Sequence, residues 1–246
     1  MFCWDESSCN MRYATHDYYM SSIKKPWSYD FAQGGIFATD GSSPWGTANR
    51  VYVKYCSSDL WSGDVGASAA TFGFEFRGSR IVAAVMQDLM QRHGLGSKQG
   101  TRLLFGGCSA GAIGAMNNLE AVASAMPGNV QTWGFLDGAA LLDIKPRGWK
   151  WDPELEPLQE LMANMSDFTV PQFPSYCATL FPGEEWKCWI GCVCPHARLA
   201  ARCGRVACAR ADACAVRLCA CAVVAAQAVP HAAHPLCSVF HQRAAV

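Results

Sequence analysis

The chain has 246 residues, of which 51% are hydrophobic, and its 20 basic and 20 acidic side chains leave no formal net charge. This length and hydrophobic content suffice for one large α/β domain with a real core. The lack of net positive charge argues against nucleic acid as a partner, and the sequence contains no run of 18 apolar residues that would cross a membrane.

The composition of the chain changes abruptly after residue 191. Residues 192–246 contain six arginines and a single acidic residue, Asp212, and they hold none of the nine Trp or seven Tyr residues. They are built mostly from Ala, Cys, Val and Arg, a low-complexity composition that offers little aromatic material for a core. We therefore expect a folded domain over residues 1–191 and a non-native or disordered tail over residues 192–246.

Three interpretations of this tail are open. We favour translation from a wrong reading frame or from unspliced, GC-rich sequence. A helical Ala-rich tail is the second interpretation, and a metal module built from its Cys and His residues is the third. The metal module is poorly supported because the tail contains no Cys-x-x-Cys pair and lacks the paired spacings of structural zinc sites.

The first predicted strand lies in the early part of the chain. Residues 1–50 predict mainly loops, because Gly-Gly, Asp-Gly and Ser-Pro pairs mark turns there. Residues 51–56 alternate with period two and predict a strand that ends at the polar turn 57–59. Because functional loops lie at such strand ends, Trp61 and Ser62 are candidates to line an acyl or sugar pocket. Trp61 has an equally good interpretation as a cover for the core edge.

A helix is predicted over residues 79–93, with Ser79 as its N-cap and Gly94 as its stop. His93, in its last turn, is better explained by the helix dipole than by catalysis. Six apolar residues form a single stripe along this helix: Ile81, Val82, Val85, Met86, Leu89 and Met90.

The most informative pattern follows the apolar run 103–105: Gly107-Cys108-Ser109-Ala110-Gly111 has the form Gly-x-Ser-x-Gly. It predicts a nucleophile elbow, in which a strand turns sharply into a helix and presents a serine hydroxyl. Ser109 is then the candidate nucleophile and the Ala110 N–H a candidate oxyanion donor. Gly107 and Gly111 are expected where side chains would collide in so tight a turn. The alternative is a tight strand-helix junction without chemistry.

The elements after the elbow complete the predicted fold. Residues 133–136 predict the next buried strand, which ends at Asp137. The order strand-helix-strand-helix-strand implies an α/β fold with a parallel sheet and helices on both faces. Residues 145–191 suggest an irregular covering segment. Helical spacing after the elbow is carried by Ile113, Met116, Leu119, Ala123 and Met126.

The cysteines before the tail suggest an oxidising compartment. Two pairs, Cys3/Cys9 and Cys177/Cys188, are close enough in sequence to close small loops as disulfides. Buried free thiols are the alternative for Cys56 and Cys108. Secretion would follow from disulfides, and an Asn-Met-Ser triplet at 164–166 is a possible glycosylation site. The first residues lack the features of a signal peptide, so we expect the true start of a secreted protein to lie upstream.

Together these stretches resemble the pectin acetylesterase and Notum family of α/β-hydrolase-type serine esterases. The resemblance covers about residues 3–191, and it implies a mostly parallel sheet with flanking helices, incomplete at both ends, and a carboxylic ester hydrolase that needs no metal or organic cofactor. The motifs that carry it lie at residues 3–9, 55–64, 76–80, 107–111, 137–143 and 184–188.

The same resemblance identifies what the chain lacks. The family adds oxyanion donors from a Gly-Trp loop, and the chain begins where that loop would end. The family's triad continues with an Asp and a His well beyond residue 188, in the territory of the Ala/Cys tail. Asp212, His231, His234 and His241 occur there in a suitable order but without matching motifs, so the triad acid and base are unassigned. Asp137 could serve as an acid, but a structural role in the following turn is favoured. His16 lies in a polar loop with no identified partner.

These observations predict a secreted carboxylic ester hydrolase that removes acyl groups from a cell-wall polysaccharide or another acylated carrier. Without an assigned base, we expect the chain to hydrolyse esters hardly or not at all. A non-catalytic glycan- or acyl-binding pseudoenzyme and an unstable product of a defective gene model are the alternatives.

Overall fold

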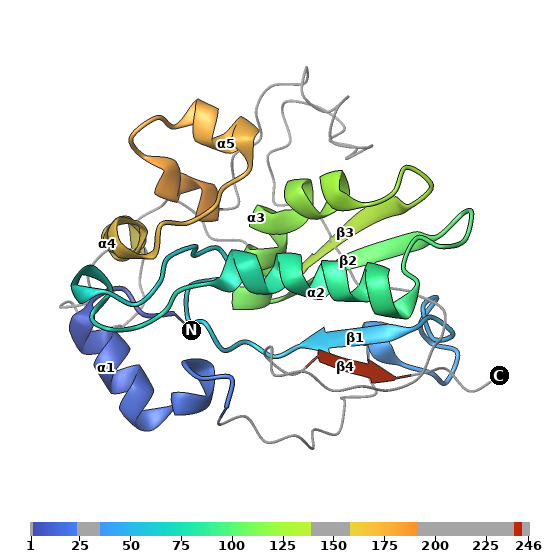
Figure 1. Cartoon of the computed structure of the whole chain (residues 1–246), viewed down its shortest axis with the longest axis horizontal. Coiled ribbons are helices and arrows are strands. Elements are labelled where there is room, and N and C mark those ends of the chain that lie inside the picture. Colours follow the sequence, from blue (N-terminus) through green and yellow to red (C-terminus); the bar gives the residue numbers. More distant parts are fainter. Residues whose placement is uncertain (1, 24–34, 139–157, 191–238, 243–246) are drawn as a thin grey trace, which may run out of the picture.

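The structure is a computed structural model, which describes residues 2–23, 35–138, 158–190 and 239–242. Short 3₁₀ turns lie at Asp17–Tyr19, Gly35–Phe37, Ala69–Thr71 and Glu185–Trp189. The helices and strands (Figure 1) are α1 (Glu6–Thr15), β1 (Arg50–Val53), α2 (Gly78–His93), β2 (Arg102–Cys108), α3 (Ala110–Ala125), β3 (Gln131–Asp137), α4 (Leu158–Thr169), α5 (Ser175–Leu180) and β4 (Val239–Gln242).

Strands β2 and β3 form the predicted parallel pair, and α3 is the helix that connects them. Their register runs from Arg102 opposite Gln131 to Cys108 opposite Asp137. Both strands are longer than the apolar runs that predicted them, because their polar ends also join the ladder. The fold is α/β and α/β-hydrolase-like, as expected from the order of the elements.

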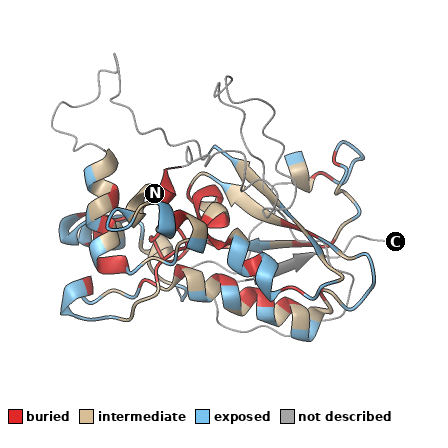
Figure 2. Ribbon diagram, turned by 90° about the horizontal axis from the view of Figure 1, so that it is seen from above, coloured by how far each residue is buried: buried red, intermediate tan, exposed pale blue. Residues whose placement is uncertain are grey.

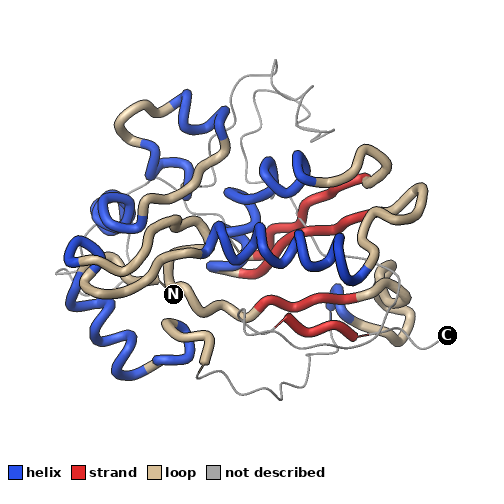
Figure 3. The backbone as a smooth tube through the Cα atoms, viewed as in Figure 1, coloured by secondary structure: helices blue, strands red, loops and turns tan. Residues whose placement is uncertain are grey.

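Strand β1 departs from the expected single sheet. It ends at Val53 rather than at residue 56, and it pairs antiparallel with β4, with Arg50 opposite Gln242. Figure 3 shows these strands and the β2-β3 pair as two separate pairs. Beyond the strand, the backbone turns with positive φ at Ser58 and Leu60. Four residues of the segment expected to be a tail therefore form a strand.

Helix α2 matches its prediction except at its start. Gly94 ends it with φ of 70°, as expected. The predicted cap was wrong: Ser79 lies in the first turn, and its hydroxyl donates to the Gly63 carbonyl at 2.9 Å. The first backbone N–H of the helix, from Gly78, instead donates to the side chain of Asp59 at 2.7 Å. A cap from a distant loop leaves no signal in the sequence next to the helix.

Helix α3 is buried over a wider face than the predicted stripe. Ile113 and Met126 are buried as expected, but Ala123 is exposed. Gly114, which belongs to no apolar stripe, is buried because the Trp61 side chain packs directly on it. Contact from the loop after β1 thus adds a second covered face to the one that meets the sheet.

Two segments expected to be irregular contain helices. Residues 1–50 include α1, which is capped by Asp5 and Ser8 and is linked to the preceding residues by a Cys3–Cys9 disulfide. In the covering segment, α4 and α5 are followed by a 3₁₀ turn, and the Cys177–Cys188 disulfide joins α5 to that turn. Both predicted disulfides are confirmed.

The core consists of two clusters. Met162, Met165 and Trp189 bring α4 and the 3₁₀ turn against the start of α3, while Val85 and Leu89 of α2 pack with Leu103 of β2. Figure 2 shows the buried residues concentrated through the middle of the molecule. No helix in the described part of the chain is long and apolar enough to cross a membrane.

Candidate active site

Ser109 occupies the turn between β2 and α3, with φ of 56° and ψ of −122°. Such a backbone conformation is sparsely populated for a residue other than glycine and costs on the order of 1–3 kcal/mol. The surrounding bonds hold it: the Ser109 N–H donates to the Asp137 carbonyl at 2.8 Å, and the Ser109 carbonyl accepts from the N–H of Ala112 and Ile113 at 2.9 and 3.1 Å. Ser109 is half-buried. The backbone thus has the strand-turn-helix form expected of the elbow.

The two glycines of the elbow have different surroundings. A Cβ on Gly107 would lie 2.5 Å from the backbone carbon of Gly111, so only glycine allows the strand and the helix to approach so closely. A Cβ on Gly111 would meet no atom of a described residue within 4 Å outside its own helix. The expected collision therefore occurs at Gly107, and the described packing gives no steric reason for Gly111.

Ala110 is the first residue of α3 and is 8% exposed. The first N–H groups of a helix lack intrahelical acceptors, and the helix dipole places partial positive charge there. An oxyanion formed next to Ser109 would meet this N–H end. The position of Ala110 is thus compatible with its predicted role.

Cys108 and Asp137 lie opposite each other at the ends of β2 and β3. Cys108 is a free thiol, as in the alternative to a disulfide, but it is exposed and not buried. Partial burial, the negative charge of Asp137 and a hydrogen bond to its carboxylate raise the pKa of the Cys108 thiol. A raised pKa leaves little thiolate at neutral pH, so Cys108 is a poor competitor to Ser109 as a nucleophile.

The structure describes the side chains of two histidines, and the contacts shown for them are with residues other than Ser109. His93 lies 3.6 Å from Asp88 in the last turn of α2, and His16 contacts Thr15 and stacks on Tyr19. Asp212, His231 and His234 lie outside the described residues, and His241 is described only as part of the β4 backbone. Among the described residues, no group of His, Cys, Asp and Glu could hold a metal ion.

Trp61 and Ser62, the candidate pocket residues, are interior residues. Trp61 is 6% exposed and packs on Gly114 of α3. Ser62 is fully buried, where it accepts a hydrogen bond from the Trp189 ring N–H at 3.0 Å and donates to the Asp59 carbonyl at 2.8 Å. Their burial agrees with the alternative of a core cover for Trp61, and a role for either residue in lining a pocket stays a prediction.

Sequence reasoning missed Asp59, a fully buried carboxylate that organises this loop. One carboxylate oxygen accepts from the Ser57 hydroxyl and the Trp61 N–H, and the other accepts from the Gly78 N–H at the start of α2. Burial raises the pKa of Asp59, and the hydrogen bonds from Ser57, Gly78 and Trp61 oppose that rise. The only signal in the sequence was an acidic residue in the turn after a strand.

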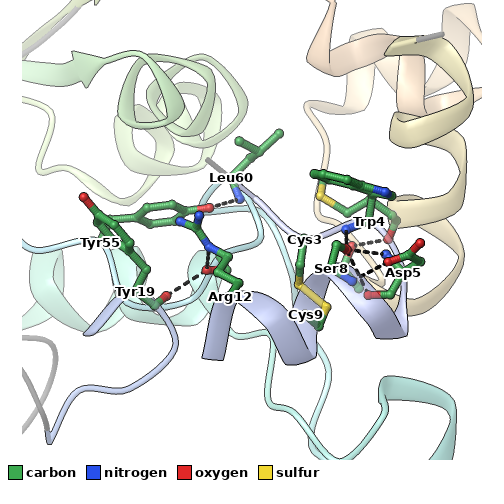
Figure 4. The surroundings of a disulfide bond; sticks show 12 residues. Cys3, Trp4, Asp5, Ser8, Cys9, Arg12, Tyr19, Tyr55 and Leu60 are labelled. Carbon is green, nitrogen blue, oxygen red and sulfur yellow. Dashed lines mark hydrogen bonds between the residues drawn. A yellow bond between two sulfur atoms is a disulfide. The ribbon is translucent and has the colours of Figure 1, made fainter. Parts of the chain in front are cut away.

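Three residues of the loop have left-handed backbones: Ser58, Leu60 and Trp61, with φ of 50°, 55° and 63°. The Leu60 N–H donates to the Tyr55 hydroxyl at 2.7 Å, as Figure 4 shows. Burial and the nearby Asp59 raise the pKa of Tyr55 well above its ordinary value, so this hydroxyl stays neutral. The loop is therefore held in a strained shape by fixed polar contacts.

The loop is also fastened to the helix that begins after Ser109. The Asn118 side-chain amide of α3 donates to the Trp61 carbonyl at 2.8 Å. A Cβ on Gly114 would lie 2.4 Å from the Trp61 Cβ, which shows how closely the loop and α3 approach. The position of the elbow thus depends on the loop as well as on the sheet.

A strand that enters a strained serine turn and continues as a helix beside a parallel neighbour defines an α/β-hydrolase-like protein. The pectinacetylesterase family model matches residues 1–165. The chain therefore belongs to the pectinacetylesterase family, as its motifs indicated.

Similar proteins agree with this assignment. Palmitoleoyl-protein carboxylesterase notum2 of Xenopus laevis is 32% identical over 198 residues, which are 77% of this chain and 39% of that protein. The Schmidtea mediterranea palmitoleoyl-protein carboxylesterase NOTUM is 30% identical over 200 residues, 77% of this chain and 37% of its own length. A crystal structure of the Wnt deacylase Notum from Drosophila superposes with a TM-score of 0.66 at 28% identity, covering 77% of this chain and 55% of that chain. The chain thus spans about two fifths of the length of these curated relatives.

Proposed function

We propose that this chain carries the nucleophile of a carboxylic ester hydrolase, with Ser109 as the attacking residue and the Ala110 N–H as an oxyanion donor. The observation that carries the proposal is the strained Ser109 turn, held by the Asp137 carbonyl on one side and by the first turn of α3 on the other. Backbone strain of this kind is characteristic of functional sites. Membership of a family whose relatives are carboxylesterases supports it.

In the proposed reaction the Ser109 hydroxyl oxygen bonds to the acyl carbon of an ester while its proton passes to a general base. The alcohol then leaves with a proton from that base, and water attacks the acyl-enzyme to release the acid and regenerate Ser109. We propose that turnover is impaired in this chain, because residues 192–246 contain no motif for the family's acid and base. Loss of the histidine or the serine in one serine protease lowers kcat by about 10⁶-fold.

The substrate class we propose is an acylated polysaccharide or an acylated protein. The family description names the first kind, and the names of the relatives specify palmitoleoyl-protein esters. We also propose secretion, because disulfides at Cys3–Cys9 and Cys177–Cys188, and a disulfide-bonded Cys56, are typical of an oxidising compartment.

A non-catalytic acyl- or glycan-binding protein is the second candidate. It is favoured by the combination of a formed elbow with a tail that lacks acid and base motifs. In such a protein the serine turn would persist while Ser109 stayed unreactive.

Two measurements on the full chain separate these functions. An active-site fluorophosphonate probe reports an activated serine, and p-nitrophenyl acetate reports turnover. Labelling that disappears in Ser109→Ala and persists in Ser97→Ala, an exposed serine of a loop, supports the nucleophile. Labelling without hydrolysis identifies impaired turnover, and no labelling identifies the binding protein. Labelling or hydrolysis that is unchanged in Ser109→Ala would refute the proposed nucleophile.

The division of the chain is also a proposal: a partial esterase domain over residues 1–191 and a low-complexity tail over residues 192–246. Sequencing the transcript across the codons around residue 191 tests the reading frame of the tail directly.

A further inference from the structure

One motif of the sequence lies outside the elbow and the Trp61 loop. The triplet Asn164-Met165-Ser166 has the form Asn-x-Ser, in which x is not proline, and this form is the acceptor for N-linked oligosaccharides in secreted proteins. The chain contains six asparagines, and Asn164 alone has a Ser or Thr two residues later. Whether the folded protein can hold a bulky polar group at this position depends on where Asn164 lies in α4.

Helix α4 has a buried face and an exposed face, and Asn164 lies on the exposed one. Its exposed residues are Glu160, Asn164 and Asp167. They follow one another at spacings of four and three residues, so they share one face of the helix. Figure 1 shows α4 near one end of the molecule, away from the β2-β3 pair. The buried residues of α4 are Met162, Met165, Phe168 and Thr169.

The buried face fixes the orientation of α4 on the domain. The Phe168 ring packs on the rings of Phe72 and Phe76, with centroid distances of 5.1 and 5.2 Å. Met165, the middle residue of the triplet, is fully buried in the same core cluster. Because these contacts hold Asn164 on the outer side, a group attached to its amide nitrogen extends into solvent and leaves the core packing unchanged.

We propose that Asn164 is an N-glycosylation site, and that the oligosaccharide is transferred before α4 forms. Side chains two residues apart do not share a helix face, so the Asn164 amide and the Ser166 hydroxyl come together only in an extended chain. In the transfer, the amide nitrogen of Asn164 bonds to the anomeric carbon of an oligosaccharide carried on a polyprenyl diphosphate. The bond from that carbon to the diphosphate oxygen breaks, the lipid diphosphate leaves with its electron pair, and the amide nitrogen loses a proton. This inference rests on the proposed secretion and is independent of Ser109.

The test uses the full chain behind a cleavable signal sequence, translated with microsomes that contain the transferase and the lipid-linked oligosaccharide. The chain that is protected from added protease is weighed before and after treatment with peptide N-glycosidase F, which releases an N-linked glycan and converts its Asn to Asp. We expect the wild type to lose the mass of one oligosaccharide. Asn164→Gln and Ser166→Ala should abolish that loss, and Ser166→Thr should retain it. Asn10→Gln is the matched control and should also retain it, because Asn10 is an exposed helical asparagine outside any such triplet.

The mass measurement decides the question even for a variant that does not fold, because transfer precedes folding. A protected wild-type chain without the loss, or a loss that persists in Asn164→Gln, overturns the proposal. Limited proteolysis of the released chains tests the position on α4: glycosylated wild type should resist digestion as well as Asn164→Gln does, and faster digestion of the glycosylated chain overturns that placement. The added signal sequence keeps this result distinct from a failure of the proposed secretion, which absence of the natural protein from the medium would report.

Discussion

Replacement of Asp59 by alanine should destabilise the fold strongly, because a single buried carboxylate serves three donors. These are the Ser57 hydroxyl and the backbone N–H groups of Trp61 and Gly78. A buried donor left without an acceptor costs roughly 1–3 kcal/mol. With three donors affected and some water entry into the vacated space, we expect Asp59→Ala to lower the free energy of unfolding by about 3–5 kcal/mol.

Asp59→Asn should have a smaller effect because it keeps the shape of the side chain. Its amide oxygen can still accept from Ser57 and Trp61, but its NH₂ group then faces the Gly78 N–H. One donor-donor conflict predicts a loss of about 1–3 kcal/mol. Urea unfolding followed by tryptophan fluorescence measures both values. Asp64→Asn is the matched control, since its ion pair with Arg80 is at the surface and is worth about 0–1 kcal/mol.

The same carboxyl should make stability depend on pH. Since burial raises the pKa of Asp59 in the folded state, the folded protein binds a proton more tightly than the unfolded chain does. This contribution to stability is fully present below the ordinary carboxyl range and is lost as pH rises through the folded pKa of Asp59. Asp59→Asn should lack this loss. If Asp59→Ala costs no more than Asp64→Asn, or if wild type and Asp59→Asn have the same pH profile, the account of this loop is wrong.

Two further predictions concern the elbow and the covering segment. Gly107→Ala should lower stability by about 1–3 kcal/mol and abolish fluorophosphonate labelling, because its Cβ would lie 2.6 Å from the Gly111 carbonyl oxygen. Gly128→Ala is the control and should do neither, because a Cβ there meets no atom of a described residue within 4 Å. Normal labelling of Gly107→Ala would contradict this prediction. Cys177→Ser should lower the unfolding free energy by about 3 kcal/mol, because it opens the loop that the disulfide to Cys188 closes over a sequence separation of 11. Thermal or urea unfolding measures this change. A loss below about 1 kcal/mol would show that packing alone orders the covering segment.

The elbow could be predicted from the sequence because all of its determinants are local. A strand, a glycine where the helix returns close to the strand, a serine and a helix follow one another within a few residues, and their spacing carries the geometry. Gly107 required only the rule that tight turns exclude side chains. The βαβ unit followed for the same reason, since α3 directly connects β2 to β3.

The loop after β1 could not be predicted, because its shape is set by residues far away in sequence. Trp61 and Ser62 were proposed as pocket residues from their place after a strand. The buried Ser62 hydroxyl instead accepts a hydrogen bond from Trp189, which lies 127 residues further along the chain. One signal was available: Gly114 lies in the middle of a helix, where glycine costs about 1 kcal/mol relative to alanine. Such a glycine indicates close approach by another segment, and that segment is the Trp61 loop.

Helix α3 connects these observations, because each of its turns is held by a different part of the chain. Its first turn fixes the Ser109 backbone, and Asn118 ties its middle to the Trp61 loop. Further along, the Glu120 carboxylate accepts hydrogen bonds from both the N–H and the hydroxyl of Ser175, at 2.8 and 2.9 Å. These contacts and the Ser109 turn share one helix, so α3 links the elbow to the Trp61 loop and to the start of α5. The buried Asp59 carboxylate belongs to this network because it accepts from the Trp61 N–H, while the Trp61 carbonyl accepts from Asn118 in the helix that begins after Ser109.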